Sequence, residues 1–229
     1  MIGIIGAMHI ETDAIVAELQ HKEETVLSGV RFAKGLWNGT EVVVATCGVG
    51  KVFAALCAEA MILHYHPRCI INSGVAGALD PCLHILNVVI AEDVVQHDMD
   101  TSPLGDPRGL LSGINRVELA ADPALNAAFE RAAAALGIPA LRGRVASGDQ
   151  FIASEEQRQF IRETFGAACC EMEGGSIGHV CFVNGVPFTV LRAISDGAAD
   201  DAKMDYPAFA AKAAEQSIKI LKKAMEELA

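Results

Sequence analysis

A chain of 229 residues is long enough to bury one sizeable core, and no Pro/Ser-rich or highly charged stretch divides it, so we expect a single domain spanning 1–229. The formal net charge of −11 would repel a phosphate backbone, and one Trp with two Tyr offers little aromatic surface for stacking on bases. These features argue against DNA, RNA and anionic membrane surfaces as partners.

The chain also lacks the signals of export or membrane insertion. No apolar run reaches the roughly 18 residues that cross a bilayer, and the N-terminus has no basic signal-peptide region. The seven cysteines are odd in number and form neither a CxxC pair nor a disulfide-like spacing, which is typical of reduced thiols. We therefore expect a cytoplasmic protein.

The opening of the chain predicts a strand followed by a helix. Met1 to Gly6 is a short apolar run that ends in glycine. The next segment carries apolar residues at helical spacing, namely Ile10, Ala14, Ala17 and Leu19. Glu11 falls in the first turn of that helix.

A β-hairpin is expected next. Val30 to Trp37 and Glu41 to Thr46 have strand character, and Asn38-Gly39 between them is the dipeptide that a two-residue hairpin turn prefers. An antiparallel hairpin therefore lies inside an otherwise alternating pattern of strands and helices.

The middle of the chain returns to that alternation. Gly50 to Tyr65 is rich in alanine and predicts a helix, and Cys69 to Asn72 predicts a buried strand. We expect this strand to break at Ser73-Gly74-Val75-Ala76-Gly77, a turn that would bring backbone close to a ligand. Val88 to Val95 predicts a further strand.

Caps and apolar runs define the second half. Asp122-Pro123 predicts an N-cap followed by proline at the first helical position, and Ser154 with Gln157 predicts a capping box. Pro187 to Ile194 predicts a strand buried on both faces, and Tyr206 to Leu228 predicts a closing amphipathic helix. The sum is an α/β fold, a three-layer αβα sandwich with a mixed central sheet.

Three carboxylates, Glu11, Glu173 and Asp196, lie at predicted strand ends. Each has an ordinary explanation. Glu11 could stabilise a helix N-terminus, Glu173 could cap a helix over Gly174 to Asn184, and Asp196 could form a turn before Gly197. Strand ends are also where α/β proteins hold ligands, and three acids placed there together favour a ligand site.

Nucleotide-binding motifs are absent. Gly48-Val49-Gly50-Lys51 does not complete a P-loop, because Ala45 replaces the first glycine and Val52 replaces the hydroxyl residue that would hold magnesium. No GxGxxG follows a strand, so a dinucleotide fold has no support beyond the alternation of elements.

Metal binding and nucleophilic serine chemistry are also disfavoured. His97-Asp98-Met99-Asp100 has metal-capable side chains, yet no second cluster completes a coordination sphere, and a polar loop is the simpler interpretation. Ser147 and Ser195 lack a neighbouring His with an orienting acid.

Six segments, in chain order, resemble one family. They are Ile2-Gly3-Ile4-Ile5-Gly6-Ala7-Met8, Gly48-Val49-Gly50-Lys51, Ile70-Ile71-Asn72-Ser73-Gly74, Ser147-Gly148-Asp149-Gln150-Phe151-Ile152, Glu171-Met172-Glu173 and Arg192-Ala193-Ile194-Ser195-Asp196. The resemblance is to the bacterial 5'-methylthioadenosine/S-adenosylhomocysteine nucleosidases. The last two segments are typical of the wider nucleoside phosphorylase superfamily, and the first is typical of its hydrolase branch.

The resemblance implies a nucleoside phosphorylase/hydrolase-like fold and hydrolysis of an N-glycosidic bond. The substrates would be 5'-methylthioadenosine and S-adenosylhomocysteine, and the products adenine and a 5'-thio-substituted ribose, as in methionine salvage. The enzyme would be a homodimer that needs no metal and no cofactor.

The resemblance also implies catalytic roles. Asp196 would protonate adenine at N7 as the C1'–N9 bond breaks, since desolvation at a buried strand end favours a protonated carboxyl group. Glu11 would accept a proton from the water that attacks C1' of an oxocarbenium-like ribose. Arg192 would help to position the groups around this water.

Other residues would hold the base and the sugar. Glu173 would accept hydrogen bonds from the ribose 2'- and 3'-hydroxyls, with Met172 packed beside the sugar. Phe151 would stack on adenine, and Ile152 would bind its edge through backbone groups. Ser195 would orient the catalytic acid.

The 5' substituent would meet apolar walls, because a thioether needs no hydrogen bonds. Met8, Val49 and Tyr206 match positions that line this pocket, and Gly77 lies in the glycine-containing turn beside the ligand. The neighbouring subunit would complete the 5' pocket.

Two positions depart from the family pattern. Val75 stands where many members carry serine, which removes a hydroxyl near the nucleophilic water. The segment Thr101 to Ile114 lacks the aromatic residue that commonly enters the neighbouring subunit's 5' pocket.

Three alternatives stay open. An aminodeoxyfutalosine or futalosine nucleosidase of menaquinone synthesis would share the fold and the acid pair. A purine nucleoside phosphorylase would need cationic groups around phosphate, and Gly6-Ala7-Met8-His9 offers no arginine for this. A catalytically silent nucleoside-binding protein would not need an acid on each side of the glycosidic bond.

Overall fold

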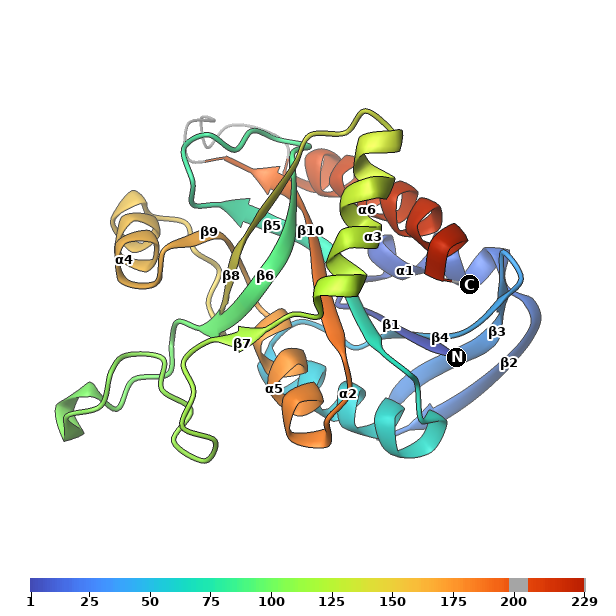
Figure 1. Cartoon of the computed structure of the whole chain (residues 1–229), viewed down its shortest axis with the longest axis horizontal. Coiled ribbons are helices and arrows are strands. Elements are labelled where there is room, and N and C mark those ends of the chain that lie inside the picture. Colours follow the sequence, from blue (N-terminus) through green and yellow to red (C-terminus); the bar gives the residue numbers. More distant parts are fainter. Residues whose placement is uncertain (198–205, 229) are drawn as a thin grey trace.

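The computed structural model of the chain describes residues 1–197 and 206–228. Within these ranges ten strands form one mixed sheet (Figure 1). They are β1 (Ile2–Gly6), β2 (Gln20–Leu27), β3 (Val30–Trp37), β4 (Thr40–Thr46), β5 (Ile70–Ala78), β6 (Val88–Gln96), β7 (Leu119–Ala120), β8 (Ala140–Ser147), β9 (Ala167–Glu171) and β10 (Phe188–Asp196). The mixed sheet that the sequence predicts is confirmed.

Part of this sheet closes on itself. β5 pairs with β9, β9 with β8, β8 with β6 and β6 with β10, and β10 pairs back with β5. In the other direction the sheet continues from β5 through parallel β1 and β4 to antiparallel β3 and β2. Because β1, β5 and β10 are mutually parallel, their carboxyl ends meet at one edge, the usual ligand edge of an α/β sheet.

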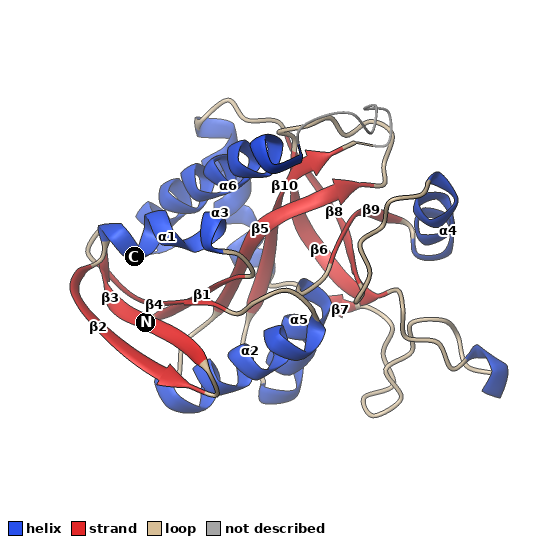
Figure 2. Ribbon diagram, turned by 180° about the vertical axis from the view of Figure 1, so that it is seen from behind, coloured by secondary structure: helices blue, strands red, loops and turns tan. Residues whose placement is uncertain are grey.

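Helices cover both faces of the sheet (Figures 1 and 2). α1 (His9–Glu18), α3 (Pro123–Ala135) and α6 (Tyr206–Leu228) pack together on one face. α2 (Lys51–Tyr65) and α5 (Gly174–Asn184) pack together on the other face. α4 (Glu155–Phe165) lies beside β9, and a short 3₁₀ turn spans Ser102–Leu104. The three-layer architecture is therefore confirmed.

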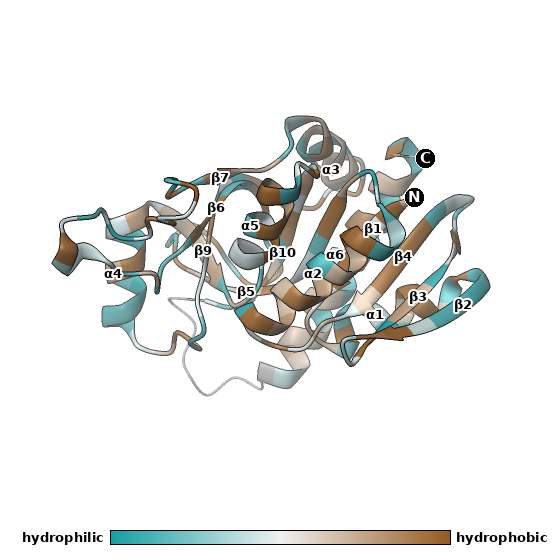
Figure 3. Cartoon of the chain, turned by 90° about the horizontal axis from the view of Figure 1, so that it is seen from below, coloured by the Kyte–Doolittle hydropathy of each residue, from teal (hydrophilic) through white to brown (hydrophobic). Residues whose placement is uncertain are grey.

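The core is built by alternation along the strands. In β1, Ile2 and Ile4 face the α3 and α6 side, where they join Phe129 and Leu221, whereas Ile5 faces the α2 and α5 side. Side chains of a strand alternate between the two faces, so a strand covered on both sides is apolar throughout. Figure 3 shows the contrast with β2, a polar edge strand whose side chains are mostly exposed.

Several local predictions are confirmed. Asn38 and Gly39 join β3 to β4 with φ of 50° and 80°, as a hairpin turn with two left-handed residues requires. The Asp122 carboxylate accepts hydrogen bonds from Ala124 N and Leu125 N at 2.9 Å. Ser154 Oγ accepts one from Gln157 N, which confirms the N-cap of α4. The Gln157 side chain pairs with Ser154 Oγ instead of the Ser154 backbone, so the second contact of the predicted capping box is not formed.

Three local predictions need correction. β2 has no counterpart in the sequence analysis, because a strand with little burial shows no apolar alternation. α1 buries Glu11, Thr12 and Ile15 instead of presenting the apolar residues at helical spacing to the core. The expected turn at Ser73–Gly77 is instead the middle of β5, which pairs with β10 along this stretch.

None of the helices in the described ranges combines the length and apolar character needed to span a membrane.

Candidate functional site

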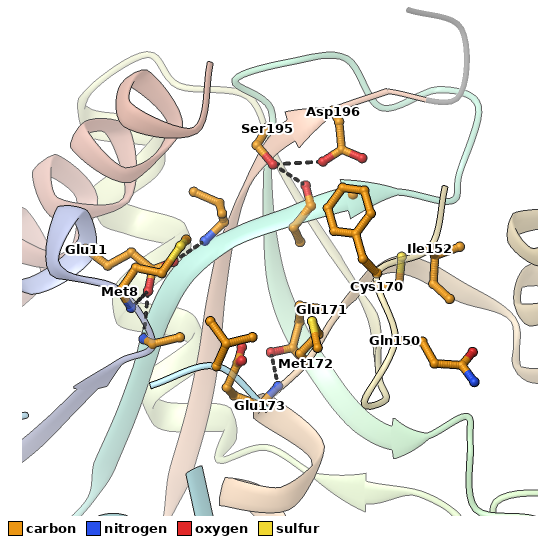
Figure 4. Close-up of a pocket in the computed structure, with 16 residues that line it drawn as sticks. Met8, Glu11, Gln150, Ile152, Cys170, Glu171, Met172, Glu173, Ser195 and Asp196 are labelled. Carbon is orange, nitrogen blue, oxygen red and sulfur yellow. Dashed lines mark hydrogen bonds between the residues drawn. The ribbon is translucent and has the colours of Figure 1, made fainter. Parts of the chain in front are cut away.

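A cavity of about 230 Å³ opens where β1, β5 and β10 end (Figure 4). Its walls come from the β1–α1 turn, β5, the β9–α5 junction, the end of β10 and the loop before α4. The lining residues are Ala7, Met8, Glu11, Val49, Val75, Ala76, Gly77, Gln150, Phe151, Ile152, Cys170, Glu171, Met172, Glu173, Ser195 and Asp196. Most site residues that the sequence predicts are therefore brought together.

Glu11 is buried and fixed by backbone donors on two elements. Its Oε2 accepts hydrogen bonds from Ala7 N at 2.7 Å and Met8 N at 2.9 Å, and its Oε1 accepts one from Val75 N at 3.0 Å. The carboxylate thus does stabilise the start of α1, but it also ties that helix to β5. Burial raises the pKa of Glu11, and the opposing effects of the Arg192 charge and the backbone donors do not cancel it.

Arg192 lies behind the cavity wall. Its guanidinium is buried and donates to Asn72 Oδ1 on β5 and to Glu171 Oε2 at the end of β9. Its Nη2 is 3.8 Å from Glu173 Oε2. Arg192 therefore holds the acids of the site rather than lining the cavity itself.

Gly74 leaves room for this arrangement. A Cβ atom at this position would overlap Arg192 Nη1 and would lie 2.5 Å from Glu11 Oε1. Real Cβ atoms do not approach other atoms so closely, so any side chain at this position would displace the arginine or the carboxylate. The glycine at the centre of β5 is thus required by the site.

Glu171 caps α5, a role that the sequence analysis considered for Glu173. Glu171 Oε2 accepts hydrogen bonds from Glu173 N at 3.0 Å and Gly174 N at 2.8 Å. Its Oε1 accepts one from Ser147 Oγ. Glu171 therefore joins the helix N-terminus, β8 and Arg192 at one point.

The Glu173 side chain points instead toward the start of α2, where its Oε1 accepts a hydrogen bond from Gly50 N at 2.8 Å. Glu173 makes no side-chain cap of α5. Burial, reinforced by the neighbouring Glu171 charge, raises the pKa of Glu173. The helix-capping explanation of this acid is therefore wrong.

Asp196 occupies the opposite side of the cavity and is only half-buried, with 26% of its side chain exposed. Ser195 Oγ donates to Asp196 Oδ1 at 2.9 Å, and Arg158 Nη2 of α4 lies 3.5 Å from Oδ2. A Cβ atom on Gly77 would lie 2.9 Å from Oδ2, so glycine makes space for this carboxylate. The Asp196 carboxylate at the end of β10 is therefore only partly desolvated.

Apolar and aromatic residues form the remaining walls. Met8, Val49, Ile152 and Met172 line the cavity, and Phe151 stands at its rim with 62% of its surface exposed. The side chain of Tyr206, the last predicted member of the site, lies outside the described residues.

Several contributors to the site carry no role predicted from the sequence. Glu171, Gln150 and Asn72 lie within the motifs that carry the family resemblance, and Cys170 directly precedes one of them. Asn72 Nδ2 donates to Ile5 O at 2.9 Å. A polar residue inside the buried run Cys69 to Asn72 was the available signal, since buried polar groups are placed where they are hydrogen-bonded.

The metal-capable segment after β6 is engaged in ion pairs. Asp98 Oδ1 lies 2.6 Å from Lys51 Nζ, and Asp100 Oδ2 lies 2.6 Å from Arg108 Nη1. Among the described residues, no group of three or more His, Cys, Asp or Glu side chains could hold a metal ion.

Glu173→Gln should stabilise the protein at alkaline pH. The substitution keeps an acceptor for Gly50 N–H and removes a buried charge. Because burial raises the pKa of Glu173 above its ordinary 4.5, the folded state binds the carboxyl proton more tightly than the unfolded chain does. The stability of the wild type therefore falls as the pH rises from the pKa of the unfolded chain to that of the folded state. We expect a gain of about 1–2 kcal/mol in the free energy of unfolding at pH 8 and none at pH 4, measured by urea denaturation.

The matched control is Glu23→Gln, which alters an exposed carboxylate on β2. It should change the free energy of unfolding by less than about 0.5 kcal/mol at either pH. Equal stability of Glu173→Gln and wild type at pH 8 would contradict the prediction.

Comparison with known proteins places the chain in a family. A profile of the phosphorylase superfamily matches residues 1–226. A curated 5'-methylthioadenosine/S-adenosylhomocysteine nucleosidase of Geobacillus kaustophilus is 37% identical over 220 residues, which cover 95% of this chain and 93% of the relative. A curated aminodeoxyfutalosine nucleosidase of Helicobacter pylori is 39% identical over 228 residues, covering 99% and 98% of the two chains.

Solved structures agree with these relatives. The crystal structure of a mutant Helicobacter pylori methylthioadenosine nucleosidase with 5'-methylthioadenosine in its active site has a TM-score of 0.93 and 37% identity, covering 99% of this chain and 98% of that chain. The chain therefore belongs to the phosphorylase superfamily, in the nucleosidase group that contains the 5'-methylthioadenosine/S-adenosylhomocysteine nucleosidases and the aminodeoxyfutalosine nucleosidases.

Proposed function

We propose that this protein hydrolyses the N-glycosidic bond of 5'-methylthioadenosine and S-adenosylhomocysteine, releasing adenine and a 5'-thio-substituted ribose. One observation carries the proposal. Glu11 and Asp196 face one cavity from different sides, and Glu173 lies on a third side (Figure 4). An acid and a base on opposite sides of the scissile bond are what hydrolysis of a glycoside requires.

Asp196 is the general acid in this proposal. Adenine leaves poorly as an anion, so a proton is delivered to N7 as the C1'–N9 bond breaks. The hydrogen bond from Ser195 Oγ fixes one carboxyl oxygen, the other lies 3.5 Å from Arg158 Nη2, and 26% of the side chain is exposed. The residue thus has both a defined orientation and a route for proton exchange with solvent.

Glu11 is the general base. A water that attacks C1' must lose a proton, and a carboxylate whose pKa is raised above its ordinary value by burial accepts it more readily than an ordinary one. The three backbone N–H donors hold the group in place before the substrate arrives. Arg192 contributes by fixing Glu171 and Asn72 behind the site.

Glu173 binds the ribose. Its Oε2 is not engaged by Gly50 and can accept hydrogen bonds from the 2'- and 3'-hydroxyls. Negative charge in this position also favours a ribose that becomes cationic in the transition state. Met172 packs beside the sugar, while Met8, Val49 and Tyr206 supply apolar contacts for the 5'-thioether.

The adenine ring lies against the loop before α4. Phe151 stacks on the ring, Ile152 binds its edge through backbone groups, and Gly77 provides the space beside Asp196. Val75 takes part through its backbone N–H to Glu11, so the absence of a hydroxyl at this position leaves the base anchored.

The charge of the cavity favours hydrolysis over phosphorolysis. The described lining residues include Glu11, Glu171, Glu173 and Asp196, and no lysine or arginine is among them. A phosphate dianion entering this cavity would meet like charges without a cationic partner, whereas a neutral water would not.

A second candidate substrate is aminodeoxyfutalosine, on which the Helicobacter pylori relative acts according to its name. Its identity to this chain, 39%, is close to the 37% of the methylthioadenosine/adenosylhomocysteine nucleosidase. The two activities share the glycosidic bond and the adenine, so only the 5' pocket separates them.

We expect adenine release from 5'-methylthioadenosine and S-adenosylhomocysteine in phosphate-free buffer containing a chelator, followed by the absorbance change on cleavage. Aminodeoxyfutalosine, assayed in parallel, serves as the competing substrate. A higher kcat/KM for aminodeoxyfutalosine would show that the second candidate is the preferred substrate. A requirement for phosphate or arsenate would show that the reaction is phosphorolysis and contradict the proposed hydrolysis.

Asp196→Asn and Glu11→Gln should each lower kcat by about 10²–10⁴-fold, the usual cost of removing a general acid or base. Binding of an uncleavable nucleoside analogue, measured by calorimetry, should persist in both variants. Asp13→Asn is the control, because Asp13 lies on the exposed face of α1 two residues from Glu11. Near-wild-type turnover by either site variant would contradict the roles given to these acids.

We also propose a homodimer formed through an apolar face on α2 and α5. Exposed apolar side chains lie on these two packed helices, namely Val52, Phe53, Leu56, Leu63, Phe182 and Val183, and Val49 just before α2 is also exposed. Exposed apolar surface of this kind is typical of protein interfaces. Since Val49 belongs both to this face and to the cavity, a second subunit here would reach the 5' pocket.

Phe53→Asp should convert the dimer into a monomer of 24.1 kDa, measured by light scattering after size exclusion, because a charge in an apolar interface is costly. KM should rise with the loss of the 5' wall. Val26→Asp, which changes an exposed apolar residue on β2, should leave the mass at that of the dimer. A wild-type protein of 24.1 kDa would refute the dimer.

We place the enzyme in the cytoplasm, within methionine salvage and adenosylhomocysteine clearance. All seven cysteines are free thiols in the structure, which suits a reducing compartment.

A further inference from the structure

Three charged residues outside the cavity lining connect its two sides. Lys51 is the first residue of α2, Asp98 follows β6, and Asp149 follows β8. Lys51 Nζ lies 2.6 Å from Asp98 Oδ1, Asp98 Oδ2 accepts a hydrogen bond from Asp149 N at 2.9 Å, and Asp149 Oδ1 accepts one from Lys51 N at 2.7 Å. We call this closed set of contacts the Lys51–Asp98–Asp149 bridge.

Each end of the bridge adjoins a wall of the cavity. On the α2 side, Val49 lines the cavity and Gly50 N donates to Glu173 Oε1 at 2.8 Å. On the other side, Phe151 and Ile152 line the cavity within three residues of Asp149. The bridge therefore connects the ribose-binding wall to the adenine-binding wall of the proposed site.

The geometry at Gly50 shows how closely the two segments approach. Gly50 has a φ of 102°, and a Cβ atom there would lie 3.0 Å from Asp149 Oδ1. A residue other than glycine would therefore be strained and would press on the bridge. This contact explains the segment Gly48-Val49-Gly50-Lys51, which does not complete a P-loop: Gly50 leaves room for Asp149, and Lys51 N donates to its carboxylate.

The bridge is stronger than an ordinary surface ion pair. The side chains of Lys51 and Asp98 are only 19% and 18% exposed, so water screens their attraction less than it screens exposed pairs. Lys51 Nζ also donates to Gln96 Oε1 at 3.2 Å. Hydrogen bonds from Lys51 and Asp149 outweigh burial and lower the pKa of Asp98, so the carboxylate stays charged at neutral pH.

We propose that Lys51, Asp98 and Asp149 are positioning residues that fix the spacing between the adenine-binding and ribose-binding walls. This inference rests on the proposed nucleosidase function. In that function Glu11 activates the water that attacks C1' and Asp196 protonates N7, and both residues are held by other contacts. Loss of the bridge therefore weakens binding of substrate and transition state alike, which raises KM and spares kcat.

Asp98→Asn and Lys51→Met remove the charge interaction. We expect each to raise KM for 5'-methylthioadenosine by about 10- to 150-fold, the range for loss of a charge-assisted hydrogen bond, with kcat within about threefold of wild type. Lys51→Arg should restore most of the affinity. The double variant should be no worse than the poorer single variant, because both substitutions break the same contact.

The control is Asp93→Asn on β6. Asp93 makes a bidentate pair with Arg144 at 2.6 and 2.9 Å, and its side chain is 16% exposed, close to the value for Asp98. This variant removes a comparable ion pair away from the cavity and should leave KM unchanged. A KM increase equal to that of Asp98→Asn would show a general stability effect and overturn the proposal.

Amide hydrogen exchange in the substrate-free protein tests whether the bridge holds the two segments in place. In Asp98→Asn we expect faster exchange in residues 48–53 and 148–153 and unchanged exchange in the strands of the sheet. Unchanged exchange in both segments, or faster exchange with an unaltered KM, would overturn the positioning role. Absence of turnover by the wild-type protein would instead refute the proposed function, and the exchange result would still decide whether the bridge holds the two walls.

Discussion

A buried arginine sets the layout of this site. A guanidinium cannot be neutralised by losing its proton, so burying one requires nearby negative charge and oriented acceptors. Arg192 lies on β10 in the closed part of the sheet, and its guanidinium donates hydrogen bonds to Asn72 of β5 and Glu171 of β9. The same positive charge partly offsets the increase in pKa that burial causes at Glu11 and Glu173. Without it, three carboxylates could not lie together beneath one cavity.

The acids of the cavity share a sign but differ in environment, and this difference supports the separate roles that we propose for them. Glu11 receives three backbone N–H groups and is almost fully buried, whereas Asp196 meets a hydroxyl, a guanidinium and solvent. Glu173 receives a single backbone donor on Oε1, and its Oε2 lies 3.8 Å from Arg192 Nη2. Similar groups placed in unlike surroundings perform different chemistry, as the two carboxylates of a glycosidase do.

Local signals were sufficient for much of the fold. The Asn38-Gly39 hairpin, the Asp122 cap and the buried strand before Asp196 each depend on neighbours in sequence. The ring of strands depends on pairing between β5 and β10, more than a hundred residues apart, which no local pattern encodes. The extent of β5 was misjudged for a related reason, because Gly74 is glycine to admit Arg192 and not to form a turn. Likewise, the motif Glu171 to Glu173 located the site, but which glutamate caps α5 is decided by tertiary contacts.

The closed ring of β5, β9, β8, β6 and β10 also determines where this protein can accept change. Every strand in the ring has at least two hydrogen-bonded neighbours, so an insertion in any one of them would shift the register of the others and misalign Arg192, Glu171 and Asp196 together. The hairpin of β2 and β3 ends at an open, polar edge on the far side of β4. New loops, fused domains or surface charges can be added there while the carboxylates of the cavity keep their spacing.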